Sequence, residues 1–223
     1  MRSTSDYYLD PDLANVGIKR EVGPSEASSM FEIELHGSSY AMKLFHDNGD
    51  LGYTKKGRDL NRFRSELNAY SNLRGFGVCE RGFVPYFYGY IDRVDPTEFE
   101  PALHHFMDDK FEPRAILLEY LPDAEELNCL NYSDDRLRHA MDGIKQIHGA
   151  HVHHQDIYPR NILIVPGDPE RVVWIDFDVA TTFTSMGPRE KAYCEYENEL
   201  VASFGELLRE HQKQGLSPNT KYY

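Results

Sequence analysis

The sequence predicts an α+β fold in which a strand-rich part precedes a mostly helical part. Short apolar runs separated by turn residues dominate the chain up to residue 120. From residue 133 onward, apolar residues recur at helical spacing instead. This segregation indicates a small lobe with an antiparallel sheet and one main helix, followed by a reduced, mostly helical lobe. With 223 residues, 40% of them hydrophobic, the chain can bury a core of that size.

The first lobe is expected over residues 17–120, after a loose N-terminal arm at 1–16. A hairpin is predicted where the turn-rich segment Gly23–Ser29 separates two apolar stretches. The two hairpin strands and the strand after them are expected at 17–22, 30–35 and 40–45.

The main helix of the first lobe is indicated by a helical repeat of apolar residues, namely Leu60, Phe63, Leu67 and Tyr70. Two more strands are expected at 83–91 and 115–120. The insert between them, residues 92–114, is polar and acidic, and we interpret it as a solvated loop.

The second lobe is expected over residues 121–223, with the crossing from the first lobe at Glu119 to Asp123. Ser133 can cap the first helix of this lobe, and Gly149 can end it. A later amphipathic stretch at 200–208 predicts a helix that closes the lobe.

Polar residues with metal-binding chemistry flank a predicted hairpin in the second lobe. The runs Ile162–Val165 and Val172–Ile175 surround a turn, and we expect their turn-proximal ends to pair, which sets Asn161 opposite Asp176. Amide and carboxylate oxygens suit Mg²⁺, which takes one or two protein carboxylates and completes its shell with phosphate oxygens and water. Asp156, five residues before Asn161, would lie beside the metal, where a carboxylate can accept a hydroxyl proton.

These motifs resemble those of the protein kinase-like superfamily. His154-Gln155-Asp156 with Asn161 is similar to the kinase catalytic loop, and Asp176-Phe177-Asp178 is similar to the metal-binding triplet. The resemblance implies a two-lobed fold, ATP and Mg²⁺ as cofactors, Asp156 as the catalytic base, and Asn161 and Asp176 as metal ligands. Asp178 replaces a glycine of protein kinases. Choline and aminoglycoside kinases often have an acidic residue there, so Asp178 is a further candidate ligand.

Upstream residues match the same superfamily in the same order. Tyr40-Ala41-Met42-Lys43 resembles the strand whose lysine holds the α and β phosphates of ATP, so Ala41 and Lys43 are candidate nucleotide-binding residues. Glu66 resembles the helix glutamate that pairs with this lysine. Glu66 also projects from the apolar face of its helix, where an unpaired carboxylate would be costly, so it needs a partner such as Lys43. The alternative is a surface pair of Glu66 with Arg62, one turn back.

Two further segments gain a role only from the resemblance. Residues 116–121 resemble the strand and hinge that bind adenine through backbone groups, which makes Glu119 and Leu121 candidates; without it, they are a core strand. Residues 23–28 lie where the superfamily has its phosphate-binding glycine-rich loop, with serines in place of two glycines, and would otherwise be a surface turn. The candidate phosphate-binding residues of this loop are Gly23, Ser25 and Ser28.

The resemblance covers residues 17–205 and is weakest after Asp178, where the long activation segment and Ala-Pro-Glu motif of protein kinases do not appear. Gln155 replaces the arginine that commonly binds a phosphorylated activation loop, and Tyr158 stands where protein-serine kinases carry a lysine. A histidine run nearby lacks the spacing of a usual zinc site. Its members are His148, His151, His153 and His154.

Composition limits the partners and the location. The formal net charge of -13 argues against nucleic acid or an anionic membrane as the main partner. Three cysteines without metal-binding spacing predict reduced thiols, and the first residues lack the apolar run of a signal peptide. We therefore expect an intracellular protein, in the cytoplasm or the nucleus.

The function predicted is an ATP- and Mg²⁺-dependent phosphotransferase that moves the γ-phosphate to a hydroxyl of an unidentified protein or small molecule. The complete catalytic set favours an enzyme. The alternative is a pseudokinase, an ATP-binding scaffold or regulatory module with little catalysis, and variant ATP chemistry on the same fold also stays open.

Overall fold

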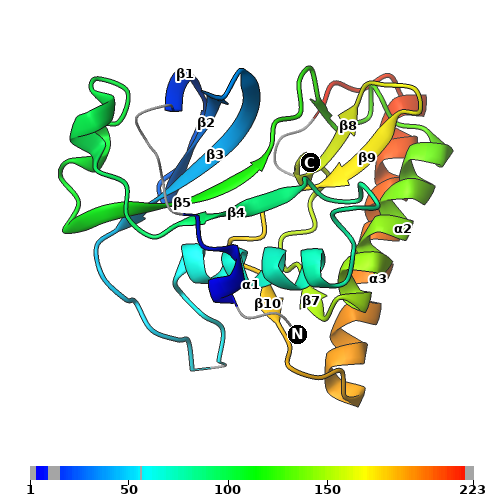
Figure 1. The fold of residues 1–223 in the computed structure, drawn as a ribbon. Helices are drawn as coiled ribbons and strands as arrows, with labels where there is room; N and C mark the ends of the chain where they lie inside the picture. Colours follow the sequence, from blue (N-terminus) through cyan, green and yellow to red (C-terminus); the bar gives the residue numbers. More distant parts are fainter. Residues whose placement is uncertain (1–3, 10–15, 56, 219–223) are drawn as a thin grey trace. The chain divides into compact units, whose positions relative to one another are not determined.

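The computed structural model describes residues 4–9, 16–55 and 57–218, and Figure 1 shows its elements. The chain forms two compact units. The first consists of Met1–Ser71 and Tyr86–Tyr120, and the second of Asn72–Pro85 and Leu121–Tyr223. Leu121 begins the last stretch of the second unit, and Asn72–Pro85, which the sequence analysis placed within the first lobe, packs with the second unit.

The first unit is built on a five-stranded sheet with the order β1-β2-β3-β5-β4. Every neighbouring pair in it is antiparallel, as expected. The strands are β1 (Val16–Pro24), β2 (Ser28–Leu35), β3 (Ser38–Asp47), β4 (Phe87–Ile91) and β5 (Phe111–Glu119). The expected strand at 83–91 is too long, because Pro85 has no N–H for a sheet ladder and the carbonyl of Phe83 accepts a bond from Trp174 in the second unit instead.

Helix α1 (Arg62–Gly75) is the main helix of the predicted pattern. It begins after Leu60, because the Asn61 side chain accepts a hydrogen bond from the N–H of Arg64 (2.9 Å) and so caps the first turn. Phe63, Leu67 and Tyr70 are buried, as their spacing indicates.

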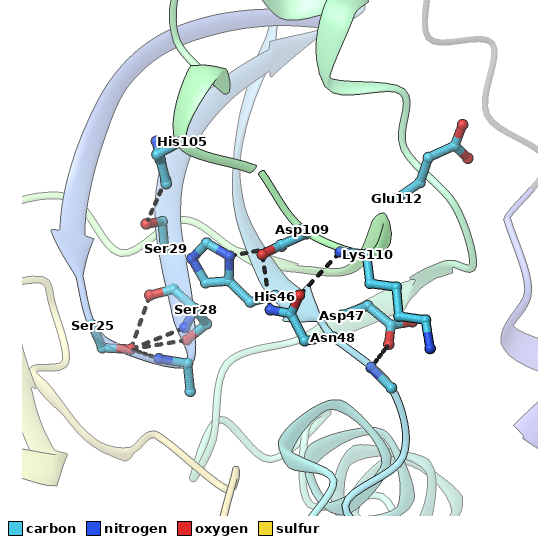
Figure 2. A network of polar contacts seen from close by, with 12 residues as sticks. Ser25, Ser28, Ser29, His46, Asp47, Asn48, His105, Asp109, Lys110 and Glu112 are labelled. Carbon is cyan, nitrogen blue, oxygen red and sulfur yellow. Dashed lines mark hydrogen bonds and ion pairs between the residues drawn. The ribbon is translucent and has the colours of Figure 1, made fainter. Parts of the chain in front are cut away.

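The insert at residues 92–114 is not a solvated loop, and that interpretation was wrong. It contains two short helices, η3 (Pro96–Phe99) and η4 (His104–Phe106), and its apolar residues complete the core of the first unit. Leu103 and Phe106 are buried against strand residues that include Phe31 and Leu44. Asp109 fastens the far end of the insert to β3, as its carboxylate contacts His46 (2.7 Å) and accepts a bond from Asn48 (3.0 Å) (Figure 2). The scattered apolar residues of the insert have no period, which is why the pattern missed them.

The described part of the N-terminal arm is packed rather than loose. Residues 1–3 and 10–15 lie outside the described residues, but Tyr7 is buried, with its ring centroid 5.2 Å from that of Phe87. Leu9 donates a backbone hydrogen bond to Tyr90 (2.8 Å). The chain passes so close to Gly89 that a Cβ atom there would lie 2.5 Å from the carbonyl oxygen of Tyr7. Only glycine fits this crossing.

The second unit combines helices with small sheets (Figure 1). The helices are α2 (Asp134–Gly149) and α3 (Pro188–Lys213), and they pack against each other. One sheet has the order β6-β8-β9, and a two-stranded sheet pairs β10 with β7. The strands are β6 (Glu125–Glu126), β7 (Val152–His153), β8 (Ile162–Val165), β9 (Arg171–Trp174) and β10 (Thr181–Thr182). Ser133 caps α2 as expected, by accepting a bond from the N–H of Arg136 (3.2 Å).

The β8–β9 register differs by one residue from the expected one. Val165 pairs with Arg171 rather than with Val172, and Ile162 pairs with Trp174. Asn161 therefore does not lie opposite Asp176; its carbonyl accepts the bond of the Ile175 N–H (3.0 Å). Both strands are buried apolar runs without alternation, so their pattern could not fix the register.

Trp174 is the centre of the second unit's core. It is fully buried, and its indole N–H donates to the carbonyl of Ala140 on α2 (2.9 Å). All three cysteines, Cys79, Cys129 and Cys194, are buried thiols, and all belong to this unit. Across the described ranges, no helix has the length and apolarity that a membrane span requires.

Candidate active site

Lys43 and Glu66 form a buried ion pair in the first unit. The Lys43 Nζ atom lies 2.6 Å from Glu66 Oε2, and the two side chains are 8% and 1% exposed. β3 supplies the lysine and α1 the glutamate. The pairing predicted from the apolar face of α1 is confirmed, and the surface position that the alternative gave to Glu66 is wrong, because Glu66 is buried. Ala41 lies on β3 two residues before Lys43, between Glu32 of β2 and Leu118 of β5.

The turn between β1 and β2 is closed by its own serines. The Ser25 hydroxyl donates to the Ser28 carbonyl (2.9 Å) and accepts from the Ser28 N–H (3.1 Å). Figure 2 shows these bonds crossing the turn, and Ser28 itself is buried. Gly23 lies within β1, paired with Met30, and space around it is open. The backbone here is thus a short, fixed turn, and phosphate binding by these three residues stays a prediction.

At the expected hinge, Glu119 is engaged within the first unit. Its backbone N–H donates to the Tyr86 carbonyl (2.8 Å), and its carboxylate accepts from the Tyr86 N–H (3.1 Å). Leu121 is the first residue of the second unit after the crossing. Adenine binding at Glu119 and Leu121 also stays a prediction.

Asp156 and Asn161 are held together in the second unit. The Asn161 amide group donates to the Asp156 carboxylate (2.9 Å) and to the Asp156 carbonyl (2.7 Å), and Asn161 is buried. The short helix η5 (Pro159–Asn161) forms the turn that brings Asn161 back to Asp156. Because the amide nitrogen is committed to Asp156, the oxygen on the other side of the planar amide is directed away from it.

His154 lies at the centre of the candidate catalytic segment, two residues before Asp156. It is fully buried, its Nε2 bonds the Ile175 carbonyl (3.0 Å), and its Nδ1 accepts from the Asp156 N–H (3.3 Å). Burial lowers the pKa of His154 below its ordinary value, although the charges of Glu197, Asp176 and Asp156 act in the opposite direction. Both aspartates are thus within electrostatic range of this ring.

The triplet 176–178 is anchored by its central residue. Phe177 is fully buried, with its ring centroid 4.7 Å from that of His154. Asp176 has a φ of 66°, in a region that non-glycine residues rarely occupy, and Asp178 lies in the turn that the Ala180 N–H closes on Phe177. Such strained backbone is held by its surroundings and often marks functional sites. Both carboxylates are half-buried.

Glu197 is a site residue that the sequence reasoning missed. From α3 it accepts the backbone N–H bonds of His154 (3.2 Å) and Gln155 (2.6 Å) and contacts His148 (2.8 Å). Burial alone would raise the pKa of Glu197, but the His148 bond, nearby His153 and the Gln155 amide outweigh it, so its pKa lies below the ordinary value. Glu197 therefore fixes the backbone that leads to Asp156.

Other side chains shape the surroundings of Asp156. Gln155 donates to the Val179 carbonyl (3.0 Å) and the Thr181 hydroxyl (2.6 Å), which ties the catalytic loop to the segment after the triplet. Arg160 lies 3.3 Å from the Asp156 carboxylate. Tyr158 is 40% exposed, and its ring approaches that of Phe204 on α3.

The donor set of the second unit fits magnesium. Asn161, directly before β8, and Asp176 and Asp178, after the end of β9, offer hard oxygen atoms, and a kinase-type Mg²⁺ needs only one or two protein carboxylates. No group of three or more His, Cys, Asp or Glu side chains within the described residues has the geometry of a metal site. An amide oxygen and two carboxylates suit a cation whose shell is completed by phosphate oxygens and water.

The fold and the motifs together define a protein of the kinase-like class. Residues 111–192 match the model of the lipopolysaccharide kinase (Kdo/WaaP) family, which is part of the protein kinase-like superfamily. The match confirms, over residues 111–192, the resemblance to that superfamily that the motifs indicate. The matched part contains Asp156, Asn161 and Asp176, whereas Lys43 and Glu66 precede it. No curated protein matches the chain significantly. The family match supports a kinase-like phosphotransferase.

Proposed function

We propose that this protein uses ATP and Mg²⁺ to phosphorylate a hydroxyl group of a sugar. The observation that carries the proposal is the catalytic segment of the second unit, where Glu197 and Asn161 hold Asp156 and the buried Phe177 anchors Asp176. Phosphoryl transfer needs positioning, neutralisation of phosphate charge and a base for the acceptor hydroxyl. The chain has a residue for each of these tasks.

The buried pair of the first unit is suited to holding nucleotide phosphates. Lys43 would bind the α and β phosphates, and Glu66 would keep the ammonium group aimed and charged. In the second unit, Asn161, Asp176 and Asp178 would hold Mg²⁺. Bound there, the cation supplies positive charge that neutralises the phosphate oxygens. Asp156 would orient the acceptor hydroxyl and accept its proton.

The name of the matched family supports a sugar as the acceptor, because lipopolysaccharide carries sugar hydroxyls. Tyr158, two residues after Asp156, is 40% exposed, so an aromatic ring lies where a sugar acceptor would approach Asp156. Gln155 supports the same choice. Its amide is committed to Val179 and Thr181, so the loop is held without a phosphorylated activation segment.

The proposal is tested by incubating the protein with ATP and Mg²⁺ and either lipopolysaccharide core oligosaccharides, a hydroxyl peptide mixture or water. Mass spectrometry scores phosphorylated acceptor, ADP and adenylate separately. We expect phosphate on the oligosaccharide. Asp156→Asn should keep the ATP-induced rise in melting temperature but slow transfer by about 10² or more. Asp176→Asn removes a metal ligand and should lose both the rise and the transfer.

The two variants also separate the enzyme from a scaffold. ATP at about 100 times its Kd should stabilise the wild type by about 2.7 kcal/mol. Binding of this strength without transfer to any acceptor would indicate a pseudokinase. Equal transfer by wild type and Asp156→Asn would remove Asp156 from the role of base.

A further inference from the structure

A pocket lies in the second unit, away from the catalytic carboxylates. Its volume is about 340 Å³, and it lies between the end of α2 and the first half of α3. Small-molecule pockets range from about 300 to 1,000 Å³, so this one suits a small ligand. Neither Asp156 nor Asp176 is among the residues that line it. The lining does include two members of the histidine run, His148 and His151.

Three lining residues carry buried polar atoms without partners. Within the described part of the chain, no group bonds Nδ1 of His148, Nδ1 of His151 or Oδ1 of Asn198. The side chain of His148 is only 7% exposed. Buried polar atoms nearly always have a hydrogen-bond partner, so three of them around one pocket point to a partner that the chain does not supply.

The chemistry of these atoms indicates what the partner must offer. His148 already uses its Nε2 in the bond to Glu197 (2.8 Å), so in the neutral ring Nδ1 is an acceptor. The amide oxygen of Asn198 is an acceptor too. A small tilt of the His148 ring that keeps its Nε2 bond, and rotation of the Asn198 amide, would present both atoms to a ligand. A ligand that satisfies them must carry hydrogen-bond donors, and hydroxyl groups are the simplest kind.

The rim of the pocket is positive. Lys145 and Lys191 are exposed lining residues, and among the described residues neither has an ion-pair partner. Glu195 is the one carboxylate in the lining. A local excess of cations is unexpected in a chain with 24 basic and 37 acidic residues. It favours a ligand that carries an anionic group.

We propose that this pocket binds a small hydroxylated anion. Its hydroxyl groups donate to His148 and Asn198, and its phosphate or carboxylate group pairs with Lys145 and Lys191. The site is separate from the proposed phosphotransferase centre, but it shares a residue with the support of the catalytic loop. His148 contacts Glu197, which in turn accepts the amide bonds of His154 and Gln155. A ligand on His148 therefore acts one side chain away from that support.

The test uses three matched probes with the full chain: glycerol 3-phosphate, glycerate and glycerol. Binding is measured by calorimetry and by the shift in melting temperature, without ATP. We expect at least one of the two anions to bind and glycerol not to bind, and the anion that binds identifies the charged group. The same affinity is expected in Asp176→Asn, so the result does not depend on the nucleotide site.

Two variants connect binding to the pocket. Lys191→Gln should weaken the anion at least about tenfold, whereas Lys213→Gln, at the far end of α3 and outside the lining, should not change it. Asn198→Leu should abolish binding while it raises the melting temperature of the free protein, because it removes an unsatisfied buried oxygen. Failure of both anions to bind, or binding that survives Lys191→Gln and Asn198→Leu unchanged, would overturn the proposal and leave the pocket to water.

Discussion

The Lys43–Glu66 pair shows how one buried charge depends on another. Both side chains are almost completely enclosed, so each loses most of its hydration on folding. A buried pair of this kind contributes little net stability, but removal of one partner takes a compensating charge away from the other. We therefore expect a larger loss of stability when one member of the pair is replaced than when both are replaced.

A double-mutant cycle measures this dependence. Glu66→Leu alone should lower the free energy of unfolding by about 3–5 kcal/mol, and Lys43→Met with Glu66→Leu should recover much of the loss because both sites become apolar. Urea unfolding of the four proteins gives the coupling energy. Strictly additive single effects would mean that the two side chains do not interact.

Residue-level reasoning from sequence found Glu66 but not Glu197, although the same physical argument applies to both. Cys194, Glu197, Val201 and Leu208 share the buried face of α3, so Glu197 is a carboxylate among apolar residues. The expected helix began only at residue 200, which left Glu197 outside it. Its partners are backbone amides and histidines more than forty residues earlier, and no local pattern connects them.

At the scale of elements, the close approach of α2 to β9 depends on a glycine. A Cβ atom on Gly143 would lie 2.9 Å from the Trp174 ring, whereas a Cβ atom on Gly75, at the end of α1, would have no neighbour within 4 Å. Trp174 also bonds α2 through Ala140. Helix α2 and strand β9, which leads to Asp176, are thus closely packed, with no space for an additional methyl group at Gly143.

Gly143→Ala should therefore destabilise the protein by about 1–3 kcal/mol through overpacking. The matched control, Gly75→Ala, should be neutral or slightly stabilising, because alanine favours the helix. Trp174 is the only tryptophan in the chain, so its fluorescence should change in Gly143→Ala alone. Equal stability of both variants would mean that Trp174 moves aside freely.

Element order was predictable from sequence, whereas register and insert packing were not. Turn residues and a change of period separate the strands of the first unit from the helices of the second, and the cap at Ser133 marks one helix start. The β8–β9 register depends on a loop one residue shorter than expected, between two runs buried on both faces. Phe106 in the insert reaches the core through tertiary packing alone.

At the scale of the whole molecule, the buried histidines make stability depend on pH. Burial lowers the pKa of both His153 and His154 below 6.5. As the pH falls below 6.5, the unfolded chain takes up protons at these positions and the folded chain does not, so stability decreases. Glu197 affects stability at lower pH. Its pKa is lower in the folded state than in the unfolded state, so it stabilises the fold above pH 4.5, and this contribution is lost as the pH falls through the pKa of the folded state.

Denaturant unfolding between pH 8 and pH 4 should thus show stability falling from about pH 6.5 downward, by at most about 1.4 kcal/mol per pH unit for each histidine. His153→Gln should make this slope shallower, because it removes one of the two groups. A profile that stays flat from pH 7 to pH 5 would contradict a folded state in which His153 and His154 are neutral.

The position of the cysteines makes local opening of the protein measurable by thiol labelling. Cys79, Cys129 and Cys194 are all buried, and burial raises the pKa of Cys194 to about 11, so the reactive thiolate is scarce as well as shielded. An alkylating reagent in native buffer should modify these thiols only as fast as the chain around them opens. All three cysteines belong to the second unit, so the labelling rate reports how often the unit that carries Asp156 opens. The first unit has no thiol, so its opening does not contribute to the labelling rate.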